Sequence, residues 1–275
     1  MNRWHSIRWL IVVLGISFVA TGGLVRAQQQ EEYQPQVGQP GKDVVWVPTQ
    51  QDLVERMLDL AKVTPKDYVI DLGSGDGRTV IAAAKRDAHA LGIEYNPKMV
   101  ELSIRNAAQA GVSDKATFVK ADLFESDFSK ATVITMFLLP DINLRLRPKL
   151  LDLKPGTRIV SNSFTMEDWQ DDATVSLESG CSSWCTAHLW IIPAKVEGKW
   201  RLPEGELAFS QQFQKISGTL ASGGKNTPIL GKLTGDQISF DAGGAEYSGQ
   251  VNGDTISGTV KTGTGNGSWQ ATREK

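Results

Sequence analysis

The chain contains 275 residues, with 29 basic and 31 acidic side chains, a hydrophobic content of 40% and two cysteines. This length fits one large domain or two ordinary ones, and the near-average composition excludes a disordered chain, a collagen-like repeat and a small disulfide-rich protein. The net charge of −2 gives no strongly basic surface, so no nucleic-acid partner is expected.

Residues 1–27 show the order of features that is typical of a secretory signal peptide. Arg3 and Arg8 precede an uncharged run over residues 9–25, and Ala27 ends a triplet that fits a cleavage site. The strongly apolar part is shorter than the roughly 20 residues that span a bilayer, so cleavage is preferred and an uncleaved membrane anchor is the alternative. We therefore expect a protein that is exported to the periplasm or another extracytoplasmic space, or one anchored in the membrane through residues 9–25.

Cleavage after residue 27 would remove three arginines and no acid, which changes the net charge from −2 to −5. Residues 28–46 are rich in Gln, Glu and Pro, and we expect them to form a tether without a core of its own.

Between residues 47 and 198, short apolar runs alternate with amphipathic stretches of helical period. Strands are predicted at residues 68–70, 89–93, 116–119, 132–138 and 157–161. Because helices separate these strands, the pattern predicts an α/β domain with a doubly wound, mostly parallel sheet. Such a sheet binds its ligands at the carboxyl ends of its strands.

A glycine-rich loop follows the first predicted strand: Asp71-Leu72-Gly73-Ser74-Gly75-Asp76-Gly77. A dinucleotide-binding fingerprint would place its third glycine at position 78, where Arg78 stands, and a phosphate-binding P-loop would contain a Lys-Ser/Thr pair. Asp71 would repel a pyrophosphate but can help to hold a cation. By itself, the loop also fits a tight turn between a strand and a helix.

Two further acids follow the next two predicted strands. Glu94 lies 23 residues after Asp71 and can accept hydrogen bonds from two ribose hydroxyls, while Tyr95 can pack on an adenine ring. Asp122, next to Leu123, lies 28 residues further on and can accept from the exocyclic amine of adenine. Each acid alone fits a solvated helix cap, but the three together with the glycine loop indicate a nucleoside site.

On these residues the sequence resembles the class I, seven-strand S-adenosylmethionine-dependent methyltransferases, over roughly residues 47–194. The run 138–164 is similar to small bacterial members. Val47-Pro48-Thr49 and the glycine loop are similar to a related group of membrane-tethered protein-lysine methyltransferases. The resemblance implies a seven-stranded sheet, S-adenosylmethionine as cofactor, no metal, and an amine acceptor such as a protein lysine. The cofactor-binding residues that it implies are Asp71, Gly73, Ser74, Gly75, Asp76, Gly77, Glu94, Tyr95, Asp122 and Leu123.

The acceptor site is expected at the end of the fourth predicted strand. The Asn/Asp-Pro-Pro-aromatic segment that many family members use for amide or base nitrogens is absent there. The apolar run from Phe137 to Leu139 could instead desolvate an amine and favour its neutral form, although it also fits a buried strand end. The acceptor-side candidates are Phe137, Leu138, Pro140, Asp141 and Asn143. Arg145, Arg147 and Lys149 are interpreted as a solvated helix face.

Cys181 and Cys185 are spaced for a local disulfide, which an oxidising compartment would favour, and two buried free thiols are the alternative. His188 follows closely, but a zinc site would need a fourth ligand, and none is evident.

Residues 199–275 contain alternating apolar positions punctuated by Gly-Asp and Gly-Gly pairs, and the runs 231–240 and 249–260 are near-repeats. The pattern predicts a small all-β antiparallel meander or barrel of about six or seven strands. It is expected to recognise a target or to pack on the first domain, and a barrel that binds an apolar ligand is the alternative.

Two functions remain open at this point. The first is a methyltransferase that acts on an amine; its difficulty is how an exported enzyme would obtain a cofactor that is made in the cytoplasm. The second is a non-catalytic exported binding protein that retains an adenosine-type pocket and uses the β unit for interaction.

Overall fold

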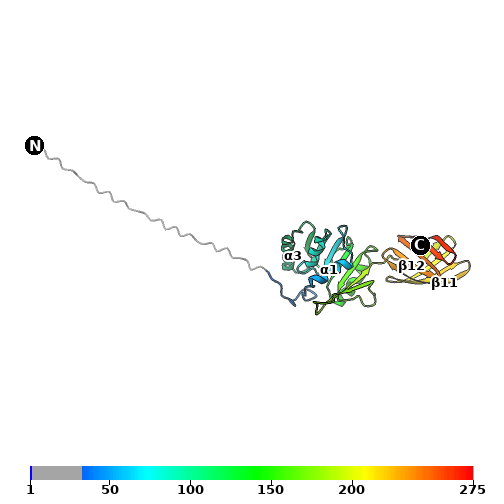
Figure 1. Ribbon diagram of the computed structural model, residues 1–275, viewed down its shortest axis with the longest axis horizontal. Coiled ribbons are helices and arrows are strands. Elements are labelled where there is room, and N and C mark those ends of the chain that lie inside the picture. The colour runs from blue at the N-terminus through cyan, green and yellow to red at the C-terminus, as the bar shows by residue number, and fades with distance from the viewer. Residues whose placement is uncertain (2–32, 275) are drawn as a thin grey trace. The chain divides into compact units, whose positions relative to one another are not determined.

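The computed structural model describes Met1 and residues 33–274. The predicted signal peptide and the first residues of the predicted tether lie outside the described residues, apart from Met1. From residue 33 onwards the chain forms an α/β part and an all-β part that follow one another in sequence (Figure 1).

The α/β part is built on one seven-stranded sheet, in the order β3-β2-β1-β4-β5-β7-β6. The first five strands are parallel, whereas β7 is antiparallel to both of its neighbours. The predicted doubly wound, mostly parallel seven-stranded sheet is thus confirmed. Its strands are β1 (Tyr68–Leu72), β2 (His89–Glu94), β3 (Ala116–Lys120), β4 (Val133–Met136), β5 (Arg158–Asn162), β6 (Ala173–Ser176) and β7 (Thr186–Ile191).

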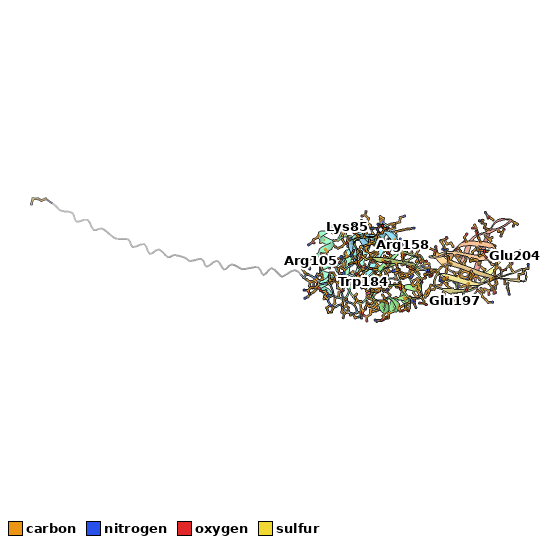
Figure 2. The ribbon with its side chains drawn as sticks, turned by 60° about the horizontal axis from the view of Figure 1, so that its bottom comes forward. Lys85, Arg105, Arg158, Trp184, Glu197 and Glu204 are labelled. Atoms are coloured by element: carbon orange, nitrogen blue, oxygen red, sulfur yellow. A yellow bond between two sulfur atoms is a disulfide. The ribbon has the colours of Figure 1, made fainter. Side chains whose placement is uncertain are left out.

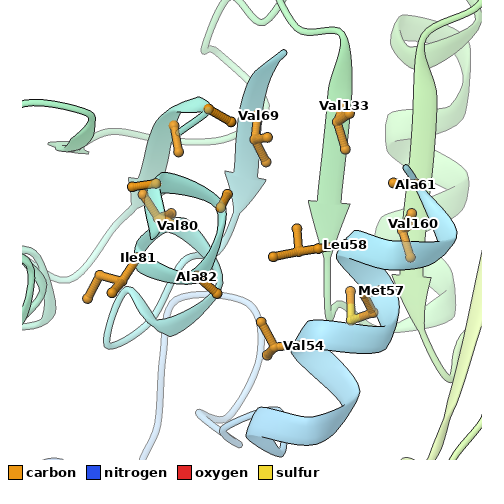
Figure 3. Close-up of a cluster of buried hydrophobic side chains, with 14 of the residues drawn as sticks. Val54, Met57, Leu58, Ala61, Val69, Val80, Ile81, Ala82, Val133 and Val160 are labelled. Carbon is orange, nitrogen blue, oxygen red and sulfur yellow. The ribbon is translucent and has the colours of Figure 1, made fainter. Parts of the chain in front are cut away.

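Helices cover both faces of this sheet, because successive residues of each buried strand point to opposite faces. Val69 packs with α1, α2 and part of α3 on one face, while Ile70 packs with α4 on the other. Figure 3 shows the first of these clusters, with Val54, Met57 and Leu58 of α1 directed at the strands. The helices are α1 (Gln51–Leu60), α2 (Arg78–Lys85), α3 (Pro97–Gln109) and α4 (Pro140–Leu151).

The ends of the elements follow local sequence signals. Helix α3 begins with Pro97 after Asn96, whose side chain accepts a hydrogen bond from the Lys98 amide at 3.0 Å. Strand β4 ends at Met136, two residues earlier than predicted, because Pro140 begins α4 and the chain turns between them. This turn leaves Phe137, Leu138 and Leu139 outside the sheet, at the carboxyl edge where ligands bind.

The basic residues of helix α4 are exposed or half-buried, as expected of a solvated face, and they also make specific contacts. The Arg145 guanidinium lies 3.9 Å from the centre of the Phe124 ring, and Arg147 pairs with Asp168 at 2.5 Å. Lys149 donates to the backbone oxygens of Phe124 and Ser126. The charged groups of all three side chains lie over aromatic rings, which the spacing of three basic residues at alternate positions does not reveal.

The all-β part is a closed antiparallel barrel of eight strands, one or two more than predicted. Its first strand, β8, begins at Gly198, one residue before the predicted start of the β unit at residue 199. The barrel core contains the buried rings of Trp200, Phe209, Phe240 and Trp269. The strands are β8 (Gly198–Leu202), β9 (Gly205–Gln212), β10 (Lys215–Ser222), β11 (Lys225–Thr234), β12 (Gln237–Ala242), β13 (Ala245–Asn252), β14 (Thr255–Thr262) and β15 (Gly265–Arg273).

Candidate active site

A cavity of about 500 Å³ opens at the carboxyl edge of the sheet, beside β1, β2 and β4. This is the point at which the strand order reverses from β1, and therefore the place where an open α/β sheet binds its ligand. Nine of the ten predicted cofactor-binding residues line the cavity: Asp71, Gly73, Ser74, Gly75, Asp76, Glu94, Tyr95, Asp122 and Leu123. The tenth, Gly77, is the residue that immediately precedes α2.

The glycine loop joins β1 to α2 through left-handed backbone conformations. Gly75 has φ of +55°, and a Cβ atom there would lie 2.7 Å from the indole nitrogen of Trp46. The amides of Gly73 and Ser74 both donate to the Ile93 carbonyl, at 2.9 and 3.1 Å. A backbone without Cβ can therefore pass close to Trp46 and still face the cavity.

Glu94 is held by two backbone amides. Its Oε2 accepts from Gly75 at 3.0 Å, and its Oε1 accepts from Asn96 at 2.8 Å. Each carboxylate oxygen keeps a second acceptor site, so the side chain can also bind two neighbouring hydroxyls. The contact with Gly75 explains how one acid at the end of β2 orients the loop that follows β1.

Asp71 is buried beneath the glycine loop, and its Oδ1 accepts from the Thr135 hydroxyl at 2.7 Å. Burial is the main cause that raises the pKa of Asp71 to about 7. The Thr135 hydrogen bond opposes this rise, and the nearby carboxylates of Asp76 and Glu94 add to it. A cation in the cavity would favour the ionised form of Asp71.

Asp76 has a different environment, since its carboxylate is already engaged by Arg78. The Arg78 guanidinium donates to both carboxylate oxygens of Asp76, and also to the Thr49 carbonyl at 2.7 Å. Asp76 therefore fixes the loop to the segment before α1, besides lining the cavity.

Lys42 contacts both residues that were expected to hold adenine, Tyr95 and Asp122. Lys42 forms an ion pair with Asp122, and its ammonium lies 5.0 Å from the centre of the Tyr95 ring. The Asp122 carboxylate also accepts from the Phe124 amide at 2.9 Å, and the bond from Lys42 lowers its pKa. Lys42 belongs to residues 28–46, which were predicted to form a tether without a core, and its contacts correct that prediction for this part of the chain.

Residues 38–46, which we call the strap, fold back on themselves and contribute to the cavity wall. Gly38 donates to the Trp46 carbonyl at 2.8 Å, Trp46 donates to Gln39 at 2.9 Å, and Pro40 and Val45 form a β-bridge. Residues 39–46 all line the cavity. The apolar run from Val44 to Val47 is unusual in a solvated tether, and it is the sequence feature that could have indicated that this segment packs on the domain.

Two of the acceptor-side candidates lie in the cavity and three do not. Phe137 and Leu138 line it, whereas Pro140, Asp141 and Asn143 are absent from its described lining. Asn143 is buried and donates to the carbonyls of Phe164 and Thr165, at 3.4 and 3.3 Å. The lining also includes Phe164 and Trp184, which are not among the predicted site residues.

Cys181 and Cys185 form the predicted disulfide. His188 shares a hydrogen bond with Asp171 at 2.9 Å. Within residues 33–274, no three His, Cys, Asp or Glu side chains are grouped so that they could hold a metal ion. No helix in this part of the chain is long and apolar enough to cross a membrane.

The lining offers the chemical groups that S-adenosylmethionine requires. The left-handed Gly75 makes room beside Trp46, Glu94 offers free acceptor sites for ribose hydroxyls, and Asp71 supplies a buried acid for a cationic ligand. The Tyr95 ring is 50% exposed and can stack on a base.

Comparison with known proteins gives three kinds of match. A family model described as the ANTKMT methyltransferase domain matches residues 71–173. The Protein-lysine N-methyltransferase of Saccharolobus islandicus is 43% identical over 152 residues, which cover 54% of this chain and 94% of the relative. The Adenine nucleotide translocase lysine N-methyltransferase of Mus musculus is 36% identical over 124 residues, which cover 44% of this chain and 54% of the relative.

Among solved structures, an RNA methyltransferase from Salinibacter ruber in complex with S-adenosyl-L-homocysteine is 47% identical. The match covers 55% of this chain and 96% of that one, with a TM-score of 0.51. The acceptors named for these relatives differ, since two are lysine methyltransferases and one is an RNA methyltransferase.

Proposed function

Because this chain belongs to the class I S-adenosylmethionine-dependent methyltransferases, we propose that it methylates the side-chain amine of a protein lysine. The chain is a methyltransferase that uses S-adenosylmethionine, and the identity of its methyl acceptor is the part that we propose. The observation that carries it is the 43% identity over 94% of the Saccharolobus islandicus relative, which is described as a protein-lysine methyltransferase.

The charges of the cavity support a cationic acceptor. Its lining contains five acids, Asp43, Asp71, Asp76, Glu94 and Asp122, and two bases. Both of these bases, Lys42 and Arg78, are bound to lining carboxylates. Four of these acids are also the expected cofactor contacts, so the excess of negative charge favours cationic ligands in general and disfavours the phosphates of RNA.

The apolar mouth supports an amine that reacts in its neutral form. Leu138 is buried and Leu139 is 46% exposed, and both line the cavity next to Phe137. Transfer from water to these apolar surroundings disfavours the ammonium, so the pKa of an entering amine falls toward neutrality. The lone pair of the nitrogen then becomes available.

The cofactor supplies a methyl group on a positively charged sulfur. Glu94, Asp122 and the glycine loop would hold its nucleoside, and Asp71 would balance its charge. For such a displacement, alignment of the acceptor with the methyl group accounts for much of the rate, so rigid positioning is the main task of the protein.

The experiment compares acceptors directly. The full-length chain is incubated with methyl-labelled S-adenosylmethionine and a lysine-rich peptide, the same peptide with arginine in place of lysine, or an RNA oligonucleotide. We expect label on the lysine peptide only, located at the side chain by mass spectrometry. Transfer to RNA but not to the lysine peptide would contradict the proposal.

Glu94→Gln is the matched control for this experiment. The change keeps the size of the side chain but removes the carboxylate charge, and we expect the dissociation constant of S-adenosylmethionine to rise about tenfold or more, since a hydrogen bond to a charged group contributes roughly 1.5–3 kcal/mol. The alternative of a non-catalytic binding protein, which the relatives do not favour, would require cofactor binding without any transfer.

We also propose that the protein acts outside the cytoplasm or at the membrane surface. The signal-like pattern of residues 1–27 supports this location, as does the Cys181–Cys185 disulfide, since such bonds persist in oxidising compartments. Cell fractionation followed by mass spectrometry of the N-terminus tests it. A chain that retains Met1 and is recovered with the cytoplasm would contradict the proposal.

A further inference from the structure

Three aromatic rings from distant parts of the chain meet at the cavity. Phe137 follows β4, Phe164 follows β5, and Trp184 lies in the connection between β6 and β7. Their ring centres are 6.0 Å apart for Phe137 and Phe164, 5.8 Å for Phe137 and Trp184, and 5.1 Å for Phe164 and Trp184. All three line the cavity, and we call them the aromatic cluster.

The cluster is not simply part of the hydrophobic core. Trp184 is 45% exposed, although it contacts both phenylalanines, and Figure 2 labels it among the side chains of the α/β part. A large indole kept partly in water indicates a contact surface more than a packing role. The exposed Leu139 lies in the same lining and extends the apolar surface.

The rings are held in place by specific supports. Asn143 of α4 is buried and donates to the carbonyls of Phe164 and Thr165. Trp184 has φ of +60°, a left-handed conformation that a residue with a side chain adopts at a cost in free energy. It lies inside the short loop closed by Cys181 and Cys185, so the disulfide restricts the backbone that carries the indole.

On this basis we propose that the aromatic cluster binds the acceptor lysine, and that the Cys181–Cys185 disulfide positions Trp184 for this task. The inference rests on the proposed function and extends it to named residues. The apolar area of the rings contacts the methylene stem of a lysine bound as the neutral amine, and their faces attract the methylated ammonium that the transfer forms.

The faces of the three aromatic rings also stabilise the positive charge that the transfer places on the acceptor nitrogen. In the transfer step the nitrogen lone pair forms the new N–C bond, while the C–S bond breaks and its electron pair remains on sulfur. The positive charge therefore moves from sulfur to nitrogen, and the methylated amine later releases a proton to water. Rings placed beside the nitrogen stabilise this developing charge.

The test measures Trp184→Ala and Trp184→Phe in the full-length chain, with the lysine-rich peptide as acceptor. For Trp184→Ala we expect the peptide KM to rise about tenfold, the size of effect typical of losing the apolar contact between an indole and the lysine stem. The dissociation constant of S-adenosylmethionine, measured by calorimetry, should stay within about twofold. Trp184→Phe should retain most of the peptide affinity.

Leu230→Ala is the matched control, because Leu230 is an exposed apolar residue of the barrel. It should change neither constant. Equal loss of cofactor and peptide binding in Trp184→Ala would overturn the assignment, because it would indicate a disturbed fold or a role in the cofactor site.

The role of the disulfide is tested by reduction. A dithiol transfers two electrons to the Cys181–Cys185 bond, which gives two thiols in the protein and a cyclic disulfide in the reagent. We expect reduction to raise the peptide KM of the wild type by several-fold and to have no further effect on Trp184→Ala, because both changes act on the same contact. Additive effects would overturn the link between the disulfide and Trp184.

Failure of the inference can be separated from failure of the proposed function. If the wild type methylates lysine and Trp184→Ala keeps the wild-type peptide KM, only the aromatic-cluster assignment is wrong. If the wild type methylates no lysine peptide, the proposed function and the assignment are both wrong.

Discussion

Asp71 has a pKa of about 7 because it is buried beside two other acids. The folded chain therefore holds a proton between about pH 4 and pH 7 that the unfolded chain has already released. The contribution of Asp71 to stability therefore falls as the pH rises through this range, by at most about 1.4 kcal/mol per pH unit. In Asp71→Asn this contribution should vanish. Urea denaturation of the cofactor-free protein at pH 5 and pH 8 measures it, and an unchanged difference in the variant would contradict the prediction.

The affinity for a cationic ligand depends on the proton of Asp71, because only the ionised carboxylate attracts the cation. S-adenosylmethionine carries a net positive charge, so we expect it to bind up to about tenfold more tightly at pH 8 than at pH 6, where Asp71 is mostly protonated. S-adenosylhomocysteine lacks the charged sulfur and should show a smaller change. Calorimetry with both ligands checks this, and an equal pH dependence for the two would show that another group is responsible.

The strap and the glycine loop act as one unit although they lie far apart in sequence. Trp46 contacts the loop at Gly75, Arg78 reaches the Thr49 carbonyl, and Lys42 pairs with Asp122. Each contact joins the segment before α1 to a residue in or beside the predicted cofactor site. Part of the wall of the site therefore comes from chain that has no regular secondary structure.

Gly75→Ala tests this contact. The new Cβ would lie 2.7 Å from the Trp46 indole nitrogen, in addition to the cost of φ at +55°. We expect the dissociation constant of S-adenosylmethionine to rise at least about tenfold, as for a loss of roughly 1.4 kcal/mol. Gly111→Ala is the control, since Gly111 has φ of +70° but nothing within 4 Å of its added Cβ. Equal cofactor affinities in the two variants would contradict the role of the strap.

The barrel and the α/β part share a buried polar contact. Trp169, fully buried, stacks on Phe213 and donates from its indole to the Gln214 side chain at 3.0 Å. Gln214 in turn donates to the Gln170 carbonyl at 2.7 Å. Because a buried polar group without a partner is costly, this contact favours folding of the two parts together.

Gln214→Ala should therefore destabilise both parts. It leaves the Trp169 indole and the Gln170 carbonyl without this partner, and we expect a loss of about 1–3 kcal/mol in the free energy of unfolding. Gln237→Ala, at an exposed barrel glutamine bonded to Asp236, should change it by less than about 0.5 kcal/mol. Chemical denaturation followed by tryptophan fluorescence compares them, and equal effects would contradict a structural role for the contact.

The sequence alone was sufficient for features that depend on neighbouring residues. The five parallel strands, the glycine loop and the three acids at or near the carboxyl ends of β1, β2 and β3 were predictable, because parallel strands bring their carboxyl ends to one edge whatever the remaining chain does. The antiparallel strands β6 and β7 had no predicted ranges. The pairing of Cys181 with Cys185 was favoured for the same reason, since the two residues are close along the chain.

Tertiary structure decided what depends on distant segments. Lys42 meets Asp122 across 80 residues, and Phe137, Phe164 and Trp184 converge from three connections between strands. The closure of the barrel also requires β8 to pair with β15. No periodicity encodes such contacts, because they arise when packing of the whole chain brings loops of irregular backbone to the same edge of a sheet.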